Sequence, residues 1–203
     1  MLLSSGAEAV IYLEELMGRK LIRKVRPKKG YRVSELDEKL RRSRTRKEAK
    51  LIHIARMGGV NAPAVIDVYE DQLVMEFVEG KRLDVFLKEN EGEEKKVMNE
   101  LGSQVAKMHL SGVVHNDLTV VNIIVGEKVY IIDFGLGEFS RSLEDRAVDI
   151  FVLIKSLKAS VPGKEDIIKD FFSGYSIMPN YEGILRRVKE IEKRGRYRVE
   201  SSG

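Results

Sequence analysis

Two carboxylates and an amide stand near one another in the second half of the chain, at Asp117, Asn122 and Asp133. If residues 122–125 pair with residues 130–133 across a four-residue loop, Asn122 lies directly opposite Asp133, with Cβ atoms about 5 Å apart. An amide oxygen beside a carboxylate is a hard-oxygen site of the kind that Mg²⁺ prefers. Asp117 can then face the metal as a base or as a group that positions a nucleophile.

The composition removes several other kinds of chemistry. The 203-residue chain has no Cys and 3 His residues, which rules out a thiolate nucleophile or Cys-ligated metal and argues against a multi-His metal cage. The longest uninterrupted apolar run, residues 150–154, is far shorter than the roughly 20 residues of a membrane-spanning helix. The segment MLLSSGAEAV lacks the basic start and long apolar stretch of a signal peptide, so we expect a soluble cytoplasmic protein.

The elements that must position these residues form two groups, of which the first is rich in strands. Apolar runs predict two hairpins, residues 9–13 with 21–25 and residues 64–69 with 73–78. A helical stretch is expected between them, because Ser34 and Thr45 both begin the Ser/Thr-x-x-Asp/Glu pattern of a helix start. We place this N-terminal lobe, with its helical insertion, at residues 1–78.

The remainder, residues 79–203, is predicted to be mainly helical. Helices are expected around the stripe of Val97, Leu101, Val105 and Met108 and over residues 144–160, 164–175 and 182–193, with short strands at residues 122–125 and 129–133. A strand-rich lobe followed by a helical lobe is an α+β architecture, and the cleft between the lobes is its natural ligand site.

The motif His115-x-Asp117 with Asn122, followed by the Asp-Phe-Gly that begins at Asp133, resembles the catalytic-loop and metal-site motifs of eukaryotic-type protein kinases. The alternative is a chance cluster of Asp and Asn in loops, and the presence of both motifs in this order between strands argues against it. The resemblance covers nearly the whole chain and implies a minimal two-lobed kinase-like fold that uses ATP and Mg²⁺. It implies Asn122 and Asp133 as metal ligands and Asp117 as the catalytic group.

Kinase-like proteins also have a phosphate-contacting Lys on the third strand, paired with a Glu on the following helix. By resemblance these residues are Lys24, at the end of Leu-Ile-Arg-Lys, and Glu48. Because Lys24 lies in a basic run, Lys20 and Arg26 stay open as alternatives. For Glu48 the alternative is an ordinary acid in the first turn of a helix that begins at Thr45.

The same resemblance implies the nucleotide contacts. The loop of residues 4–9 has one glycine, so a phosphate cradle there would use backbone N–H groups and Ser hydroxyls, with candidates Ser5, Gly6, Ala7, Glu8 and Ala9. The segment ending at residue 78 resembles the hinge, where the backbone of Glu76 and Val78 would bind adenine. Asp149 resembles the carboxylate that supports the catalytic loop, with an exposed helical acid as the alternative.

Several short sequence segments are similar to those of the small atypical kinase subunit of the KEOPS complex. These segments are residues 6–9, 29–32, 44–49, 115–122, 133–136 and 193–198. The chain departs from that family at Asn116, where Gly is usual, and at Val120 and Val121, where Thr-Ser is usual. About ten residues separate Gly135 from the next predicted helix and no Ala-Pro-Glu follows, so the activation segment is short and the helical lobe reduced.

The resemblance to this family implies an ATP-dependent Ser/Thr protein kinase or ATPase that supports threonylcarbamoyladenosine modification of tRNA. It implies a threonylcarbamoyl transferase subunit on the C-terminal lobe, a small regulatory subunit on the N-terminal lobe, and tRNA as partners. Two alternatives stay open: a small-molecule phosphotransferase of the aminoglycoside or choline kinase type, and a nucleotide-binding scaffold without turnover.

The net charge of +4 conceals two basic blocks around an acidic middle. Residues 19–56 hold 16 Lys and Arg against 4 Asp and Glu, and residues 186–198 hold 7 against 2. Such blocks either bind nucleic acid or form a solvated helix face. Part of the first block would serve ATP, so we expect tRNA at the basic tail, residues 194–203, through phosphate contacts of Arg194, Arg196 and Arg198.

Overall fold

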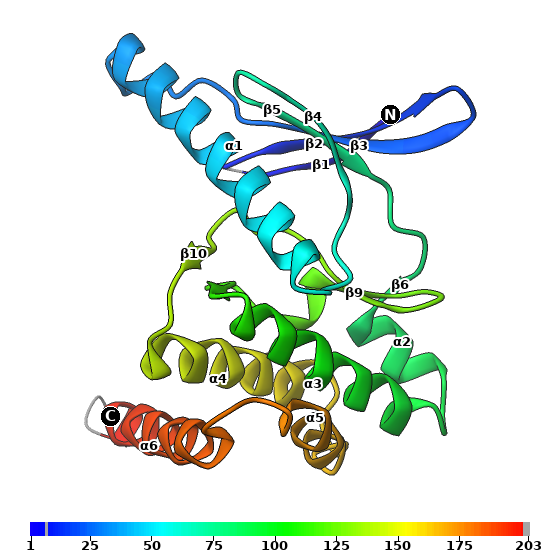
Figure 1. Ribbon diagram of the computed structural model, residues 1–203, viewed down its shortest axis with the longest axis vertical. Coiled ribbons are helices and arrows are strands. Elements are labelled where there is room, and N and C mark those ends of the chain that lie inside the picture. Colours follow the sequence, from blue (N-terminus) through cyan, green and yellow to red (C-terminus); the bar gives the residue numbers. More distant parts are fainter. Residues whose placement is uncertain (7, 201–203) are drawn as a thin grey trace.

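The structure is a computed structural model that describes residues 1–6 and 8–200, and the side chains of all of these except residues 195–200. Ala7 and the side chains of Arg196 and Arg198 therefore lie outside the described residues. Figure 1 shows a sheet crossed by one long helix, and below it a group of helices with short strands between the two. The predicted α+β order is confirmed.

The N-terminal sheet has five antiparallel strands in the order β1-β2-β3-β5-β4. Their bounds are β1 Leu2–Ser5, β2 Val10–Leu16, β3 Arg19–Val25, β4 Val65–Tyr69 and β5 Gln72–Glu76. Both predicted hairpins are present, and β1 adds an edge strand. The β2–β3 turn consists of Met17 and Gly18, both with positive φ (52° and 74°), which matches the twist of a two-residue hairpin.

A single 24-residue helix, α1 (Ser34–Met57), lies against β4 and β5. The second helix start predicted at Thr45 is wrong, because Thr45 lies inside α1 and its hydroxyl donates to the Arg41 carbonyl 3.0 Å away. A Thr in a helix interior commonly satisfies its hydroxyl in this way. Glu48 is consequently an interior residue of α1, buried on its inner face, and not a first-turn acid.

The C-terminal part contains five α-helices and two small sheets among the described residues. The helices are α2 Leu83–Glu89, α3 Glu94–Leu110, α4 Leu143–Ser160, α5 Ile167–Tyr175 and α6 Tyr181–Glu200, and the strands are β6 Lys81–Arg82, β7 Val113–Val114, β8 Ile123–Val125, β9 Val129–Ile131 and β10 Glu138–Phe139. No helix in the described part of the chain combines the length and the apolar character needed to cross a membrane.

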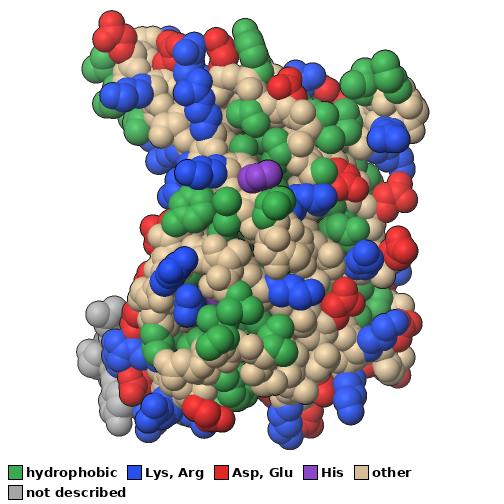
Figure 2. Space-filling model, in the orientation of Figure 1, with side chains coloured by type: hydrophobic (Ala, Val, Ile, Leu, Met, Phe, Trp, Pro, Cys, Tyr) green, Lys and Arg blue, Asp and Glu red, His purple; other side chains and the backbone are tan. Residues whose placement is uncertain are grey.

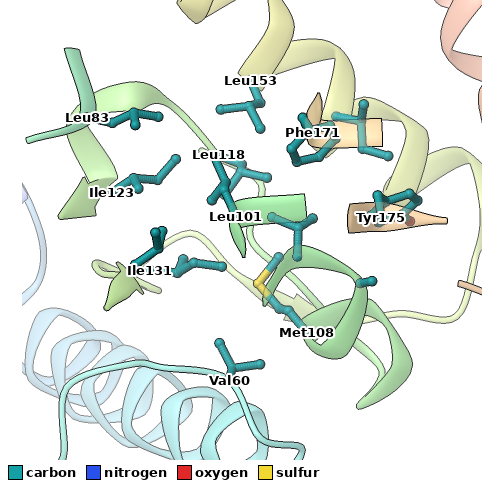
Figure 3. Close-up of a cluster of buried hydrophobic side chains, with 14 of the residues drawn as sticks. Val60, Leu83, Leu101, Met108, Leu118, Ile123, Ile131, Leu153, Phe171 and Tyr175 are labelled. Atoms are coloured by element: carbon teal, nitrogen blue, oxygen red, sulfur yellow. The ribbon is translucent and has the colours of Figure 1, made fainter. Parts of the chain in front are cut away.

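The core of this part is built on α3. The predicted stripe from Val97 to Met108 is buried. Figure 3 shows Leu101 and Met108 in one cluster with labelled side chains of α4, α5, β8 and β9. Helices α3 and α5 touch backbone to backbone: a Cβ on Gly174 would lie 1.8 Å from the Asn99 carbonyl oxygen. This close packing fixes α3, whose C-terminal end leads through β7 into the catalytic-loop motif.

The β8–β9 hairpin differs from the predicted register by one residue. Ile123 faces Ile131, so Asn122 lies opposite Ile132 and not Asp133, and its carbonyl accepts a hydrogen bond from the Ile132 N–H at 2.9 Å. The loop holds residues 126–128, one fewer than predicted, and loop length sets the register of a hairpin. The first residue of this loop is Gly126, where a larger residue would not fit, because a Cβ there would lie 2.2 Å from the Glu79 carbonyl oxygen.

The last helix is longer than expected. The helix predicted over residues 182–193 runs from Tyr181 to Glu200, so most of the segment we predicted as a basic tail continues α6. Arg194 begins this continuation, and its side chain lies 4.0 Å from Glu144, at the limit of an ion pair. The division into lobes at residue 78 stays a prediction; the five-stranded sheet ends at Glu76 and β6 begins at Lys81.

Candidate active site

A cavity of about 430 Å³ lies between the N-terminal sheet and the helical part. Met75, Glu76, Phe77 and Val78 line it where the chain leaves the sheet, and most of the other lining side chains are apolar. Asn122, Lys24 and Asp133 supply polar groups. A mainly apolar pocket of this size with a few converging polar groups suits a small molecule with a flat ring.

A second cavity, of about 540 Å³, continues from the first. The two share Lys24 and Asp133, and the second is lined in addition by Asp117 and by three cations that the first lacks, Arg26, Arg44 and Lys47. Its polar lining suits anionic groups attached to the occupant of the first cavity. Arg44 and Lys47 were not selected from the sequence, since only the course of α1 turns these two members of the basic block toward Asp117.

One buried carboxylate joins two cations, Lys24 on β3 and Arg26 directly after the end of this strand. Lys24 Nζ lies 2.7 Å from Glu48 Oε1, and Arg26 Nη2 lies 2.7 Å from Glu48 Oε2. Arg26 follows the last residue of β3 and is two residues from Lys24, a spacing that places both side chains on the same side of an extended chain. Lys24 Nζ also contacts Asp133 Oδ1 at 2.6 Å, whereas Lys20 pairs with Glu79 at the surface. Of the three basic residues considered, Lys24 is the one that contacts both Glu48 and Asp133.

The Lys24–Asp133 pair is held in its charged form. Burial alone would lower the pKa of Lys24, but the carboxylates of Glu48 and Asp133 outweigh it and the pKa lies above its usual range. Burial alone would raise the pKa of Asp133, but the adjacent Lys24 ammonium and the Gly135 N–H keep this pKa below its usual range. At neutral pH Asp133 is therefore an anion able to bind a cation.

Replacing Glu48 with Gln should lower the free energy of unfolding by about 3 kcal/mol, because it leaves the buried Lys24 and Arg26 cations without their common counter-charge. Urea denaturation followed by circular dichroism measures the loss. Glu38→Gln is the matched control, since Glu38 lies on the same helix but pairs with Arg42 at the surface. Equal stabilities of the two variants would contradict the assigned role of the buried triad.

Asn122 connects the catalytic-loop motif to the first cavity. Its Nδ2 donates to the Asp117 carbonyl oxygen at 2.9 Å and to Asp117 Oδ2 at 3.0 Å. With Nδ2 so engaged, the Oδ1 atom of Asn122 is the group left for a cation. The donor set that lines the first cavity, this amide oxygen and the Asp133 carboxylate, fits Mg²⁺, which takes few protein ligands and completes its shell with water and phosphate oxygens.

Asp133 reaches the site through its backbone conformation. Its φ is +61°, a left-handed value that Asp tolerates better than most residues, and it stands two residues after Ile131, the last residue of β9. The following Gly135 leaves room for the ion pair: a Cβ there would lie 3.0 Å from Asp133 Oδ1 and 3.2 Å from Lys24 Nζ. The left-handed backbone of Asp133 thus brings its carboxylate to Lys24, whereas the predicted register would have placed Asp133 directly opposite Asn122.

Asp149 supports the catalytic loop from within α4. Its two carboxylate oxygens accept hydrogen bonds from the backbone N–H groups of His115 (2.6 Å) and Asn116 (2.7 Å). Burial lowers the pKa of His109, so this ring is neutral and Nε2 can donate to Asp149, 3.2 Å away, while Nδ1 accepts from the Tyr175 hydroxyl. Asp149 is fully buried, so the alternative of an exposed helical acid is wrong.

The second cavity is lined by Ser4, Gly6, Glu8 and Ala9 from the segment in which the phosphate cradle is predicted. Gly6 N–H donates to the Ala9 carbonyl at 3.0 Å, and Glu8 Oε2 is 2.6 Å from Arg44 Nη1, which ties the loop to α1. Ser4 lines both cavities, whereas Ser5, the candidate named from the sequence, lines neither. Neighbouring residues of a strand point to opposite sides, and both serines belong to β1.

Part of the first basic block is compensated by acidic neighbours. Arg41, Arg42 and Arg44 of α1 each pair with a carboxylate at 2.6–2.8 Å. Figure 2 shows Asp and Glu side chains among the Lys and Arg side chains that lie over α1. This mixed surface is a weaker anion-binding face than the sequence count indicates.

Comparison with known proteins identifies the family of the chain. Residues 17–136 match the model of the RIO domain. The KEOPS complex subunit Bud32 of Pyrococcus abyssi is 40% identical, over 98% of this chain and 97% of the relative. A probable bifunctional tRNA threonylcarbamoyladenosine biosynthesis protein of Methanosarcina acetivorans is 43% identical over 96% of this chain, which spans only 35% of that relative.

A solved structure of a kinase with a RIO-type name has the same fold as this chain. The Rio2 kinase of Chaetomium thermophilum, in a complex with ADP, Mg²⁺ and phosphoaspartate, superimposes with a TM-score of 0.65 over 99% of this chain and 70% of that one, at 16% identity. The predicted two-lobed kinase-like fold is thereby confirmed. With its near-complete match to a Bud32 protein of similar length, the chain belongs to the RIO-domain family, within the Bud32 group.

Proposed function

We propose that this chain is the kinase-like subunit of a KEOPS-type complex, an ATP-dependent phosphotransferase or ATPase that supports threonylcarbamoyladenosine modification of tRNA. The observation that carries the proposal is one set of contacts: Lys24 bridges Glu48 and Asp133, while Asp117 is bonded to Asn122 at the same pair of cavities. The names of the related proteins agree with it.

In this proposal the two cavities divide the nucleotide between them. The apolar cavity holds adenine against the backbone of Glu76 and Val78, and the polar cavity holds the phosphates. Lys24 orients the α- and β-phosphates, with Arg26 and Lys47 as further cations toward the γ-phosphoryl group. Asn122 and Asp133 hold Mg²⁺, which when bound neutralises charge on the phosphate oxygens.

Asp117 carries the last role in this proposal. It lines the polar cavity, and its position there suits a carboxylate that accepts a hydrogen bond from water or from a Ser or Thr hydroxyl. The acceptor oxygen is thereby oriented for in-line attack on the γ-phosphorus, and Asn122 Nδ2 holds the carboxylate in place.

The proposal extends to partners. A threonylcarbamoyl transferase subunit would bind the helical lobe, a small regulatory subunit the strand-rich lobe, and tRNA the C-terminal end of α6 in the cytoplasm. Arg26, Arg44 and Lys47 of the first basic block line the polar cavity, which favours α6 over that block as the RNA contact.

ATP hydrolysis tests the proposal when measured with the chain alone, with a transferase partner, and with partner plus tRNA. We expect low turnover alone and strong stimulation when both are present. Stimulation of ADP release by sugars, choline or aminoglycosides would instead support a small-molecule phosphotransferase. Nucleotide binding without turnover in all three conditions would support a scaffold and contradict the proposed activity.

A further inference from the structure

Asn116 stands between the two halves of the catalytic motif in a conformation that most residues avoid. Its φ is +60°, in the left-handed region where only Gly is unstrained and where Asn is the best tolerated of the other residues. The side chain is exposed and lines neither cavity. Asn116 is therefore not placed to touch the nucleotide, although it directly precedes Asp117.

The Asn116 side chain connects two segments that are twenty residues apart. Its Nδ2 lies 3.2 Å from the carbonyl oxygen of Leu136, to which it donates a hydrogen bond. Leu136 follows Gly135 and lines the polar cavity next to Asp117. The amide of Asn116 thus joins the loop that carries Asp117 to the segment that follows Asp133.

The two ends of this contact are held differently. On one side, the backbone N–H of Asn116 is fixed by the buried Asp149 at 2.7 Å. On the other side, Leu136 is 62% exposed and lies within the turn from Phe134 to Gly137, which leads directly into β10 at Glu138. The contact therefore ties an exposed turn to a rigid part of the core.

We propose that Asn116 is a positioning residue, whose side-chain amide clasps the segment after Asp133-Phe134-Gly135 to the catalytic loop and so sets Asp117 and Asp133 at their working separation. A short amide suits this task, because it accepts the left-handed backbone and still offers a donor to a carbonyl. The inference rests on the proposed ATP-dependent activity, to which it adds a residue that acts through Asp117 and Asp133.

Two substitutions separate the side-chain donor from the backbone conformation. Asn116→Gly removes the amide and keeps positive φ accessible, whereas Asn116→Asp keeps the shape and the φ tolerance but has no N–H to donate at neutral pH. For each, kcat and KM for ATP are measured by ADP release, and hydrogen exchange of the amides at residues 134–139 is followed by mass spectrometry.

Both variants should lose about 5-fold in kcat, the effect expected of one neutral hydrogen bond, with KM for ATP within 2-fold of wild type. Exchange at residues 134–139 should be faster in both. The clasp would be overturned if both variants kept wild-type kcat and wild-type exchange. It would also be overturned if only one of the two variants differed from wild type. A wild-type chain without ATP turnover in any condition would contradict the proposed function, and the exchange data would still decide the clasp.

Discussion

Replacing Asp133 with Ala should abolish ATP turnover, with a loss of at least about 10³-fold. The variant loses one of the two oxygen ligands proposed for Mg²⁺ and the carboxylate that lies 2.6 Å from Lys24. The pKa of Asp133 lies below its usual range, so the wild-type residue is charged at neutral pH and its full charge is lost in the variant. Initial rates of ADP formation, at saturating ATP and Mg²⁺, measure the effect.

Two controls make the Asp133 result specific. Asp133→Asn keeps the volume of the side chain and should also lose most of the activity, because an amide does not replace the negative charge beside Lys24. Asp166→Asn removes an exposed carboxylate that lines neither cavity and pairs only with Lys169 among the described residues, so it should keep wild-type turnover. An Asp133→Ala protein that is folded and keeps most of its turnover would overturn the metal assignment.

Replacing Asp117 with Asn should lower kcat by about 10²- to 10⁴-fold, the range expected for a group that orients or deprotonates the attacking oxygen. The fold should survive, because the new amide still offers an oxygen to Asn122 Nδ2. Nucleotide affinity should stay within about 3-fold of wild type, since the proposal gives Asp117 a contact with the attacking oxygen and none with the phosphates or the metal. Single-turnover rates and calorimetric titration with a non-hydrolysable ATP analogue separate the two effects.

The Asp117 and Asp133 substitutions should differ in their effect on nucleotide binding, and this difference tests the roles proposed for the two residues. Asp133 is proposed to bind the metal, so its loss should weaken Mg²⁺-dependent nucleotide binding as well as turnover. Asp117 should affect the chemical step alone. If Asp117→Asn weakens nucleotide binding in proportion to its loss of turnover, Asp117 acts in binding and the proposed division of roles is wrong.

The hairpins of the N-terminal sheet could be predicted because their information is local. Runs of apolar and β-branched residues flank short turns, and the turn at Met17 and Gly18 also sets the register of the β2–β3 hairpin. The β8–β9 hairpin shows the limit of the same reasoning. Its strands are three residues long, so the hydrophobic pattern does not distinguish a three-residue from a four-residue loop, and the contact of Gly126 with the distant Glu79 decides between them.

Helix α1 shows a different limit. Two adequate start patterns follow one another in the sequence, and both cannot be helix starts in one uninterrupted helix. Packing against β4 and β5 holds α1 continuous through Thr45, whose hydroxyl then turns back to the helix itself. Tertiary contacts usually determine the extent of a helix more strongly than capping patterns do.

The sequence by itself determined the family and the two-part α+β order, and it predicted Asp117, Asn122 and Asp133 as site residues, because motif spacing and residue type carry that information locally. For Lys24 it left Lys20 and Arg26 open, and the contacts of Lys24 with Glu48 and Asp133 distinguish it from them. Only the tertiary structure decided that Glu48 serves Lys24 and Arg26 together, and that Asn116 reaches Leu136. These contacts join segments about 20 residues or more apart, and their geometry depends on how α1, β3 and the β8–β9 hairpin pack, which no local pattern records.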